Sequence, residues 1–127
     1  MFQLDNKSRT PIYEQIVDQV ERHILAGLIS DKLPSVRSLS VSLRVNVNTV
    51  GRAYTELERA GVVVAAPGRG VFVSETAASL LRERKRLSAL SEFKVLLLEL
   101  RSCKILKTEL LALVEKTFNK EEEEGEI

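Results

Sequence analysis

The chain has 127 residues, the length of about one small domain, and its 44% of apolar and 29% of charged residues are typical of a folded protein. The formal net charge is +1, so the total charge indicates no partner. Because the chain has one cysteine (Cys103), one histidine (His23) and no clustered acid pair in a plausible pocket, we expect no disulfide, no metal, no cofactor and no enzymatic activity.

The sequence also predicts where the protein works. No stretch approaches the roughly 18 uncharged apolar residues of a membrane span, and the first residues lack the pattern of a signal peptide. A single cysteine favours a reducing compartment. We therefore expect a cytoplasmic protein without a membrane partner.

The first two predicted helices are marked by capping residues. Thr10 can cap a helix that has Pro11 at its first position, and apolar residues then recur every four positions until Gly27. Ser35 can cap a second helix of about two turns. The two apolar stripes consist of Ile12, Ile16, Val20 and Ile24, and of Val36, Leu39 and Leu43.

A third helix is predicted after a tight turn. Arg44 stands in that turn, where we expect a positive φ, and Asn46 can cap the helix, which ends before Gly61. Gly51 lies inside this helix at a cost of about 1 kcal/mol relative to alanine. The apolar residues of the helix, at steps of three and four, are Val50, Ala53, Tyr54, Leu57 and Ala60.

The pattern then changes to that of β-strands. Residues 62–66 and 71–73 are rich in β-branched side chains, and the Pro-Gly-Arg-Gly segment between them is typical of a turn, with Arg69 near its tip. A hairpin that follows three helices, two of them joined by a tight turn, indicates a winged helix-turn-helix.

Two further helices are predicted in the remaining chain. The first carries a long apolar stripe and is apolar nearly all round at residues 95–98, so more than one of its sides must be covered. The final helix can cover one side, which leaves the other for a second copy of the chain. We expect the dimer interface at Leu90, Phe93, Leu97 and Leu100. The apolar residues of the final helix are Leu106, Leu110, Leu113, Val114 and Phe118.

These patterns predict a mostly α fold with a small β-hairpin, in three parts. Residues 1–74 form an N-terminal winged helix-turn-helix domain, and residues 75–119 form a short C-terminal helical dimerisation region of two helices. Residues 120–127 form an acidic disordered tail.

The winged helix-turn-helix carries a local excess of arginine, which indicates a nucleic-acid face. Residues 35–73 contain five arginines against two glutamates. In the DNA major groove, Asn matches the edge of adenine and small apolar groups touch the thymine methyl. Asn48 and Thr49 are therefore base-reading candidates and Val47 is a candidate for a thymine methyl. Asn46 is expected to cap the helix or to contact a phosphate.

Three arginines are the candidate DNA-binding cations. Arg37 lies in the first turn of the second helix and Arg52 about one turn into the third, where both can reach phosphate. Arg69 stands between two glycines and can enter a minor groove. Each arginine alone is more often a solvated surface residue, and backbone angles alone explain the two glycines. Their convergence on one motif favours DNA binding.

The chain closely resembles the DNA-binding domain of GntR-family transcription regulators over about residues 9–74. Five ordered stretches carry this resemblance: residues 11–16, 33–37, 48–54, 57–58 and 68–73. The resemblance implies DNA contacts for Arg37, Asn48, Thr49, Arg52, Arg69 and Gly70. The short helical C-terminal part is similar to that of the YtrA-like subfamily, whose members are dimeric bacterial regulators.

The sequence departs from the family pattern at three places. The segment 28–32 is shorter than the usual turn and lacks its Pro and Gly. Ser38 replaces the Glu that would complete a capping box with Ser35, and Arg44 replaces a turn glycine. We interpret these as changes in sequence preference or stability, because the arginines and the hairpin are present.

The leading hypothesis is a homodimeric repressor that binds double-stranded DNA at a near-palindromic operator, with half-sites about 10 base pairs apart or a multiple of that. The alternative is a winged-helix protein-interaction module without DNA readout, against which the arginines argue. An unknown small-molecule effector that binds between the subunits is a further hypothesis, motivated by the apolar surplus at residues 95–98.

Overall fold

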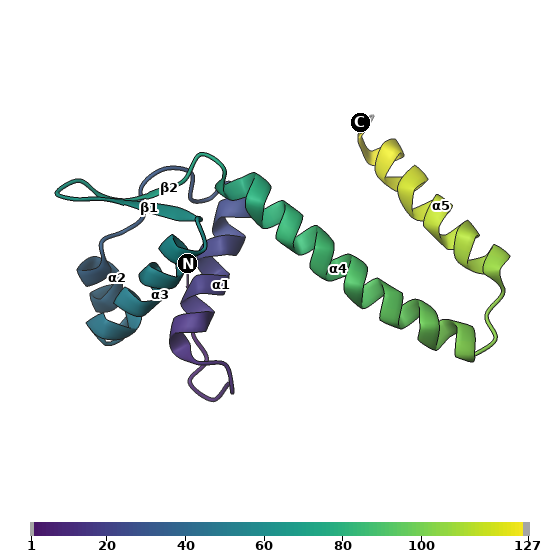
Figure 1. Cartoon of the computed structure of the whole chain (residues 1–127), viewed down its shortest axis with the longest axis horizontal. Helices are drawn as coiled ribbons and strands as arrows, with labels where there is room; N and C mark the ends of the chain where they lie inside the picture. Colours follow the sequence, from purple (N-terminus) through teal and green to yellow (C-terminus); the bar gives the residue numbers. More distant parts are fainter. Residues whose placement is uncertain (1, 126–127) are drawn as a thin grey trace. The chain divides into compact units, whose positions relative to one another are not determined.

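The computed structural model describes the backbone of residues 2–125 and the side chains of residues 2–120. Within that part the chain divides into two compact units, Met1–Lys85 and Arg86–Ile127. In chain order the elements of Figure 1 are α1 (Ile12–Leu25), α2 (Val36–Leu43), α3 (Val47–Arg59), β1 (Val63–Ala66), β2 (Gly70–Val73), α4 (Ala77–Ser102) and α5 (Lys107–Gly125).

The core of the first unit is built from the predicted apolar stripes. Helix α3 packs against α1, α2 and β1, and its residues Val50, Ala53 and Leu57 are fully buried. Helix α1 contributes a buried row of Ile16, Val20 and Ile24 at steps of four residues. Ala60 is exposed, in contrast to its predicted place in the stripe, because it forms the C-terminal cap of α3 rather than its packed face.

Two of the three predicted helix caps are confirmed. The Ser35 Oγ accepts a hydrogen bond from the backbone N–H of Ser38 at 3.0 Å, and the Asn46 Oδ1 accepts one from the N–H of Asn48 at 2.7 Å. Arg44 ends α2 in the left-handed region with φ 55°, as predicted for the turn. The short α2 is therefore fixed at both ends, and α3 begins at a defined point after it.

The predicted cap at Thr10 is wrong. Pro11 is the capping residue of α1, with φ −54° and ψ 149°, and no side chain caps this end. A proline at this place supplies the extended backbone that a cap needs, so the first helical residue is Ile12. The carbonyl of Thr10 accepts a hydrogen bond from the side-chain amide of Gln15 instead.

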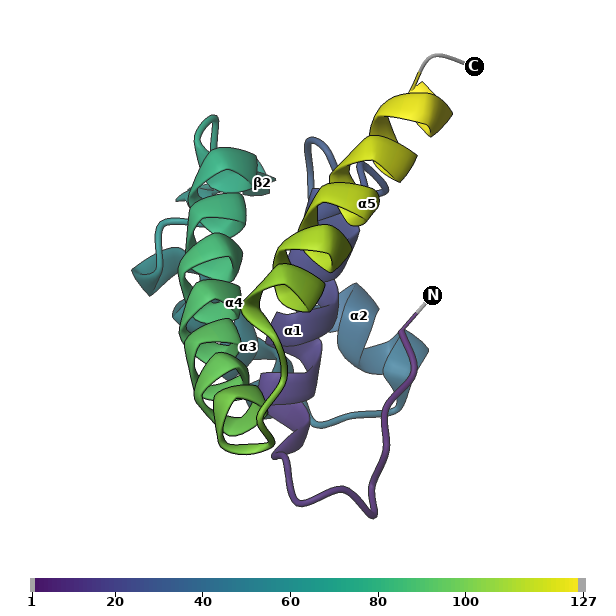
Figure 2. The ribbon, with the colours of Figure 1, turned by 90° about the vertical axis from the view of Figure 1, so that its right-hand side faces the viewer.

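The N-terminal segment runs back along α1, where two glutamines bind it (Figure 2). The side chain of Gln19 accepts from the N–H of Gln3 at 2.7 Å and donates to the carbonyl of the same residue. The side chain of Gln15 binds both backbone groups of Asp5 in the same way, at 2.8 and 2.9 Å. Each glutamine side chain thus binds both the N–H and the C=O of one residue, as the backbone of a neighbouring β-strand does.

The hairpin is antiparallel, with Val63 opposite Val73 and Ala66 opposite Gly70. A third segment adds to it: the N–H of Leu33 donates to Val71 at 2.8 Å, and the N–H of Val73 donates to Asp31 at 2.7 Å. The hairpin thus holds the end of the short segment 28–32, just before α2.

The first unit extends into α4, beyond the boundary that the sequence predicts after residue 74. Ala77 and Leu81 are buried in its core. An ion pair of 2.8 Å between the Arg84 guanidinium and the Glu21 carboxylate also joins α4 to α1. The compact unit therefore ends at Lys85, because the first turns of α4 complete the core of the winged helix-turn-helix.

The second unit consists of the rest of α4 and α5, joined at Lys104, which has φ 62°. Leu97 and Leu100 are half-buried, whereas Leu90 and Phe93 are each 44% exposed. Helix α5 continues to Gly125, so its backbone is helical over residues 120–125, where the sequence predicts disorder. Residues 126–127 of the predicted tail lie outside the described residues, as do the side chains of residues 121–125.

No helix of the described residues combines the length and apolar character needed to cross a bilayer. In the same part of the chain, no three His, Cys, Asp or Glu side chains lie close enough together to hold a metal ion.

Candidate nucleic-acid interface

The N-terminal turn of α3 presents the predicted base-reading side chains. Asn46, Val47 and Asn48 are exposed and Thr49 is half-buried, and the apolar Val47 leaves 48% of its surface exposed. The Oδ1 of Asn46 is occupied by the helix cap, which leaves its side-chain N–H groups for a partner. The turn therefore carries amide, hydroxyl and methyl groups, the kinds of group that read the major-groove edges of base pairs.

Three exposed arginines accompany this turn in the first unit. Arg37 lies in the first turn of α2, Arg52 lies in α3 and Arg69 lies in the β1–β2 turn. Among the described residues, the ion pairs of this unit join Arg59 to Glu56 and Arg84 to Glu21, so they leave these three guanidinium groups to other partners. Cations without an internal acidic partner are available for phosphate.

The position of α3 is fixed by a buried tyrosine. The hydroxyl of Tyr54 donates a hydrogen bond of 2.6 Å to the carbonyl of Pro34, just before α2. The ring is only 5% exposed, and this burial raises the pKa of Tyr54 to about 12. The bond thus connects the middle of α3 to the segment that leads into α2, which sets the two helices of the helix-turn-helix relative to each other.

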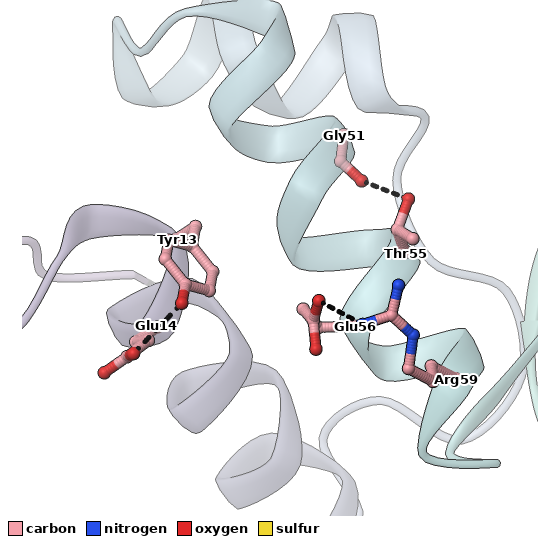
Figure 3. A network of polar contacts seen from close by, with 6 residues as sticks. All are labelled: Tyr13, Glu14, Gly51, Thr55, Glu56 and Arg59. Atoms are coloured by element: carbon pink, nitrogen blue, oxygen red, sulfur yellow. Dashed lines mark hydrogen bonds and ion pairs between the residues drawn. The ribbon is translucent and has the colours of Figure 1, made fainter.

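Tyr13 lies on α1, which packs against α3, and its side chain faces α3 (Figure 3). The centre of its ring is 3.8 Å from the Cζ atom of Arg52. Its hydroxyl donates to the Glu14 carboxylate at 3.1 Å, and this hydrogen bond, with partial desolvation, raises the pKa of Tyr13 above its usual value. The sequence predicts Tyr13 as a packing residue, and the contact with Arg52 is an addition to that role.

Lys32, in the segment before α2, adds a second cation to the hairpin beside the β1–β2 turn. Gly68 and Gly70 have φ of 78° and 125°, angles that favour glycine. A Cβ atom on Gly70 would lie 2.6 Å from the Cε atom of Lys32, so the lysine chain crosses the hairpin at this glycine. The Nζ of Lys32 is also 5.9 Å from the centre of the Phe72 ring.

Sequence reasoning did not single out Lys32. The signal that could have found it is strand alternation, because Leu33 is buried and the residue before it must then point to the opposite face. That signal becomes visible only once residues 31–33 are known to pair with the hairpin.

Comparison with known proteins decides the family of this chain. The profile described as "Bacterial regulatory proteins, gntR family" matches residues 12–73. The HTH-type transcriptional repressor YtrA of Bacillus subtilis is 44% identical over 101 residues, which cover 78% of each chain. The chain belongs to the GntR family.

Solved structures agree with this assignment. A transcriptional regulator from Oenococcus oeni is 26% identical with a TM-score of 0.75, covering 93% of this chain and 99% of the other. YtrA from Sulfolobus acidocaldarius, a GntR-family transcription factor, is 37% identical with a TM-score of 0.55, covering 70% and 97%. The protein is a YtrA-like GntR transcription regulator with a winged helix-turn-helix, and not an enzyme.

The second unit of this GntR regulator contains an open apolar cavity of about 570 Å³ within its own two helices. Its lining combines four apolar side chains with three cations: Leu97, Leu98, Ile105 and Leu110, with Lys94, Arg101 and Lys107. Of the predicted interface residues, Leu97 lines this cavity. Burial of such an apolar surface against another apolar surface would lower the free energy considerably.

Proposed function

We propose that this GntR regulator is a cytoplasmic homodimeric repressor whose two copies of α3 enter successive major grooves of a near-palindromic operator. The observation that carries the proposal is the exposed N-terminal turn of α3, in a unit where Arg37, Arg52 and Arg69 are exposed and have no acidic partner among the described residues. The assignment as a repressor rests on the relative from Bacillus subtilis, a transcriptional repressor that is 44% identical to this chain over 101 residues.

The proposed contacts follow from the chemistry of the side chains. Asn48 and Thr49 read base edges and Val47 touches a thymine methyl, because these groups stand exposed or half-exposed at the start of α3. Asn46 donates its free side-chain N–H groups to a phosphate. Arg37 and Arg52 bind phosphate, and the segment of Arg69 and Gly70 approaches the minor groove, where a glycine lets the backbone come close.

Dimerisation is proposed for the second unit, through the stripe Leu90, Phe93, Leu97 and Leu100. A second copy would cover apolar surface that two helices alone leave open, and two-fold symmetry then requires two half-sites in the DNA. The winged-helix protein-interaction module is the less favoured alternative. Such a module does not need exposed arginines without an acidic partner, as Arg37, Arg52 and Arg69 are in the described part of the chain.

The first experiment is selection from a random duplex library at about physiological salt, with the enriched sites read by sequencing. An enriched inverted repeat is expected, with half-sites about 10 base pairs apart or a multiple of that. No enrichment from folded, dimeric protein would favour the interaction module.

Two substitutions then separate base reading from phosphate binding. Asn48→Ala is expected to relax base preference while it leaves binding to random duplexes nearly unchanged. Arg52→Ala is expected to weaken binding to all duplexes and to lower the salt slope by about 1. Arg22→Ala is the control, since Arg22 is an exposed arginine of α1 that is not among the predicted DNA contacts. Equal losses of Asn48→Ala on operator and random DNA would contradict its base-reading role.

A further inference from the structure

The contact between Tyr13 and Arg52 joins α1 to the DNA-facing helix α3. The Cζ of Arg52 lies 3.8 Å from the centre of the Tyr13 ring, well inside the roughly 6 Å within which a guanidinium is attracted to an aromatic face. Tyr13 is half-buried and Arg52 is exposed. The ring is therefore the better-fixed partner, and the arginine is the one that it restrains.

An aromatic partner leaves the guanidinium free to bind an anion. Stacking uses the face of the guanidinium plane, whereas its five N–H donors point outward within that plane. A carboxylate partner would occupy those donors and would have to be displaced by a phosphate. The Tyr13 ring holds Arg52 without this competition.

The two glutamates that affect the pKa of Tyr13 each have a partner other than Arg52. Glu14 accepts the hydrogen bond from the Tyr13 hydroxyl at 3.1 Å. Glu56, one turn after Arg52 on α3, forms an ion pair of 3.0 Å with Arg59 (Figure 3). Neither carboxylate forms an ion pair with Arg52 in the described part of the chain, although both lie close enough to Tyr13 to affect its pKa.

We infer that Tyr13 is a positioning residue for DNA binding, which holds the Arg52 guanidinium in the orientation that a backbone phosphate needs. The inference rests on the proposed DNA-binding function, and it adds a residue of α1 that contacts the arginine rather than the DNA. Its effect comes from ordering a long, exposed side chain before binding, so that less conformational entropy is lost in the complex.

The test is a double-mutant cycle on the full chain, with the operator found by selection. Tyr13→Leu removes the aromatic face but keeps an apolar side chain, and it is expected to weaken operator binding about fivefold, the size of an exposed cation–π contact. Tyr13→Phe keeps the face and loses only the hydroxyl, so we expect its affinity to stay within about 1.5-fold of the wild type. In an Arg52→Ala background, Tyr13→Leu is expected to have no further effect.

The salt dependence separates positioning from direct contact. Arg52→Ala removes a phosphate contact and is expected to lower the salt slope by about 1. Tyr13→Leu leaves the cation in place, so the slope is expected to stay that of the wild type while the affinity falls. A purely structural role of Tyr13 would instead lower the melting temperature and would act equally in the presence and absence of Arg52.

If Tyr13→Leu fails to fold, Tyr13→Met and Tyr13→Trp extend the series, with affinity expected in the order Trp at or above Tyr, then Met, because Trp has the strongest aromatic face for a cation. The inference would be overturned if the Tyr13 substitution lowered operator affinity by the same factor in the Arg52→Ala background as in the wild type. Failure of the wild-type chain to enrich any duplex would overturn the proposed function instead, so the two failures are distinguishable.

Discussion

The two units of this chain differ in what they do with apolar residues. In the first unit, residues from α1, α3, the hairpin and the start of α4 form one buried core, in which Ile16, Val50 and Leu57 have no exposed surface. In the second unit no described hydrophobic side chain is buried. Leu96, Leu98 and Leu113 there each expose more than half of their surface.

This difference shows that a buried core depends on how many sides of each apolar stripe are covered, and not on the number of helices alone. The first unit has helices on several sides of α3 and a hairpin beside it, so each apolar stripe meets another. The second unit has two helices, one of them apolar nearly all round, and two helices cannot enclose each other. The first unit is thus complete within one chain, whereas the second needs a partner, which we propose is its own copy.

The largest expected effect comes from a charge at the centre of the second unit. Leu97→Glu is expected to convert dimer to monomer, because a carboxylate cannot be buried against the apolar face of a partner. Loss of the second DNA-binding unit is then expected to weaken operator binding about a hundredfold or more. Light scattering gives the mass and fluorescence anisotropy the affinity.

Ser88→Glu is the matched control for that experiment. It places the same charge on the same helix at an exposed position outside the apolar stripe. The mass of the dimer and the affinity for the operator are both expected to stay those of the wild type. A dimeric mass for Leu97→Glu would remove this stripe from the interface.

The second prediction concerns the core of the first unit. Leu57→Ala is expected to lower the free energy of unfolding by about 3 kcal/mol, because Leu57 is fully buried and the cavity cannot be filled by solvent. The chain has no tryptophan, and both of its tyrosines, Tyr13 and Tyr54, belong to the first unit. Tyrosine fluorescence during urea denaturation therefore reports on this unit.

Leu98→Ala is the comparison in the second unit. Leu98 is 56% exposed within one chain, so the same truncation is expected to leave the tyrosine-detected transition unchanged and to weaken self-association instead. A loss of about 3 kcal/mol from the tyrosine signal of Leu98→Ala would mean that the two units do not unfold separately.

Much of the first unit could be predicted from residues with local effects. Ser35 and Asn46 cap their helices because a side-chain oxygen satisfies an N–H two or three residues away, and this depends on nothing distant. Arg44 could be placed in a left-handed turn for the same reason. The arginines of the candidate interface could likewise be found by charge and position.

Features that depend on distant partners could not be predicted. Lys32 follows no pattern of its own, and its place beside Gly70 follows from pairing of residues 31–33 with the hairpin. The stack of Tyr13 on Arg52 depends on how α1 crosses α3. The burial of Leu81 at the start of α4 is likewise decided by the distant core that it joins.

The third prediction is a pH dependence of the first unit. Burial raises the pKa of Tyr54 from 10.0 to about 12 in the folded chain. The stability that this residue contributes is therefore fully present below pH 10 and is lost as the pH rises through about 12, since the unfolded chain releases its proton first.

Tyr54→Phe tests this dependence. It is expected to lower the free energy of unfolding by about 2 kcal/mol near neutral pH, because the carbonyl of Pro34 loses its hydrogen bond. It is also expected to reduce the fall in stability between pH 10 and 12, measured by circular dichroism in urea. Parallel curves for the two proteins over that range would contradict the assignment to Tyr54.

The smallest expected effect is a gain in stability. Gly51 lies inside α3 without a positive φ, and a Cβ atom there would meet no atom within 4 Å. Gly51→Ala is therefore expected to raise the free energy of unfolding by about 1 kcal/mol, measured in urea. A simultaneous loss of operator affinity would indicate that the glycine allows close approach to DNA, whereas a loss of stability would contradict the open space at this position.

The two glutamines of α1 have a consequence for the timing of local opening. The amide protons of Gln3 and Asp5 belong to exposed residues, yet each is held by a side chain that projects from α1. Such protons exchange with solvent deuterium only when that side chain lets go. Isotope exchange at these two amides therefore reports how often the side chains of Gln15 and Gln19 release the N-terminal segment from α1.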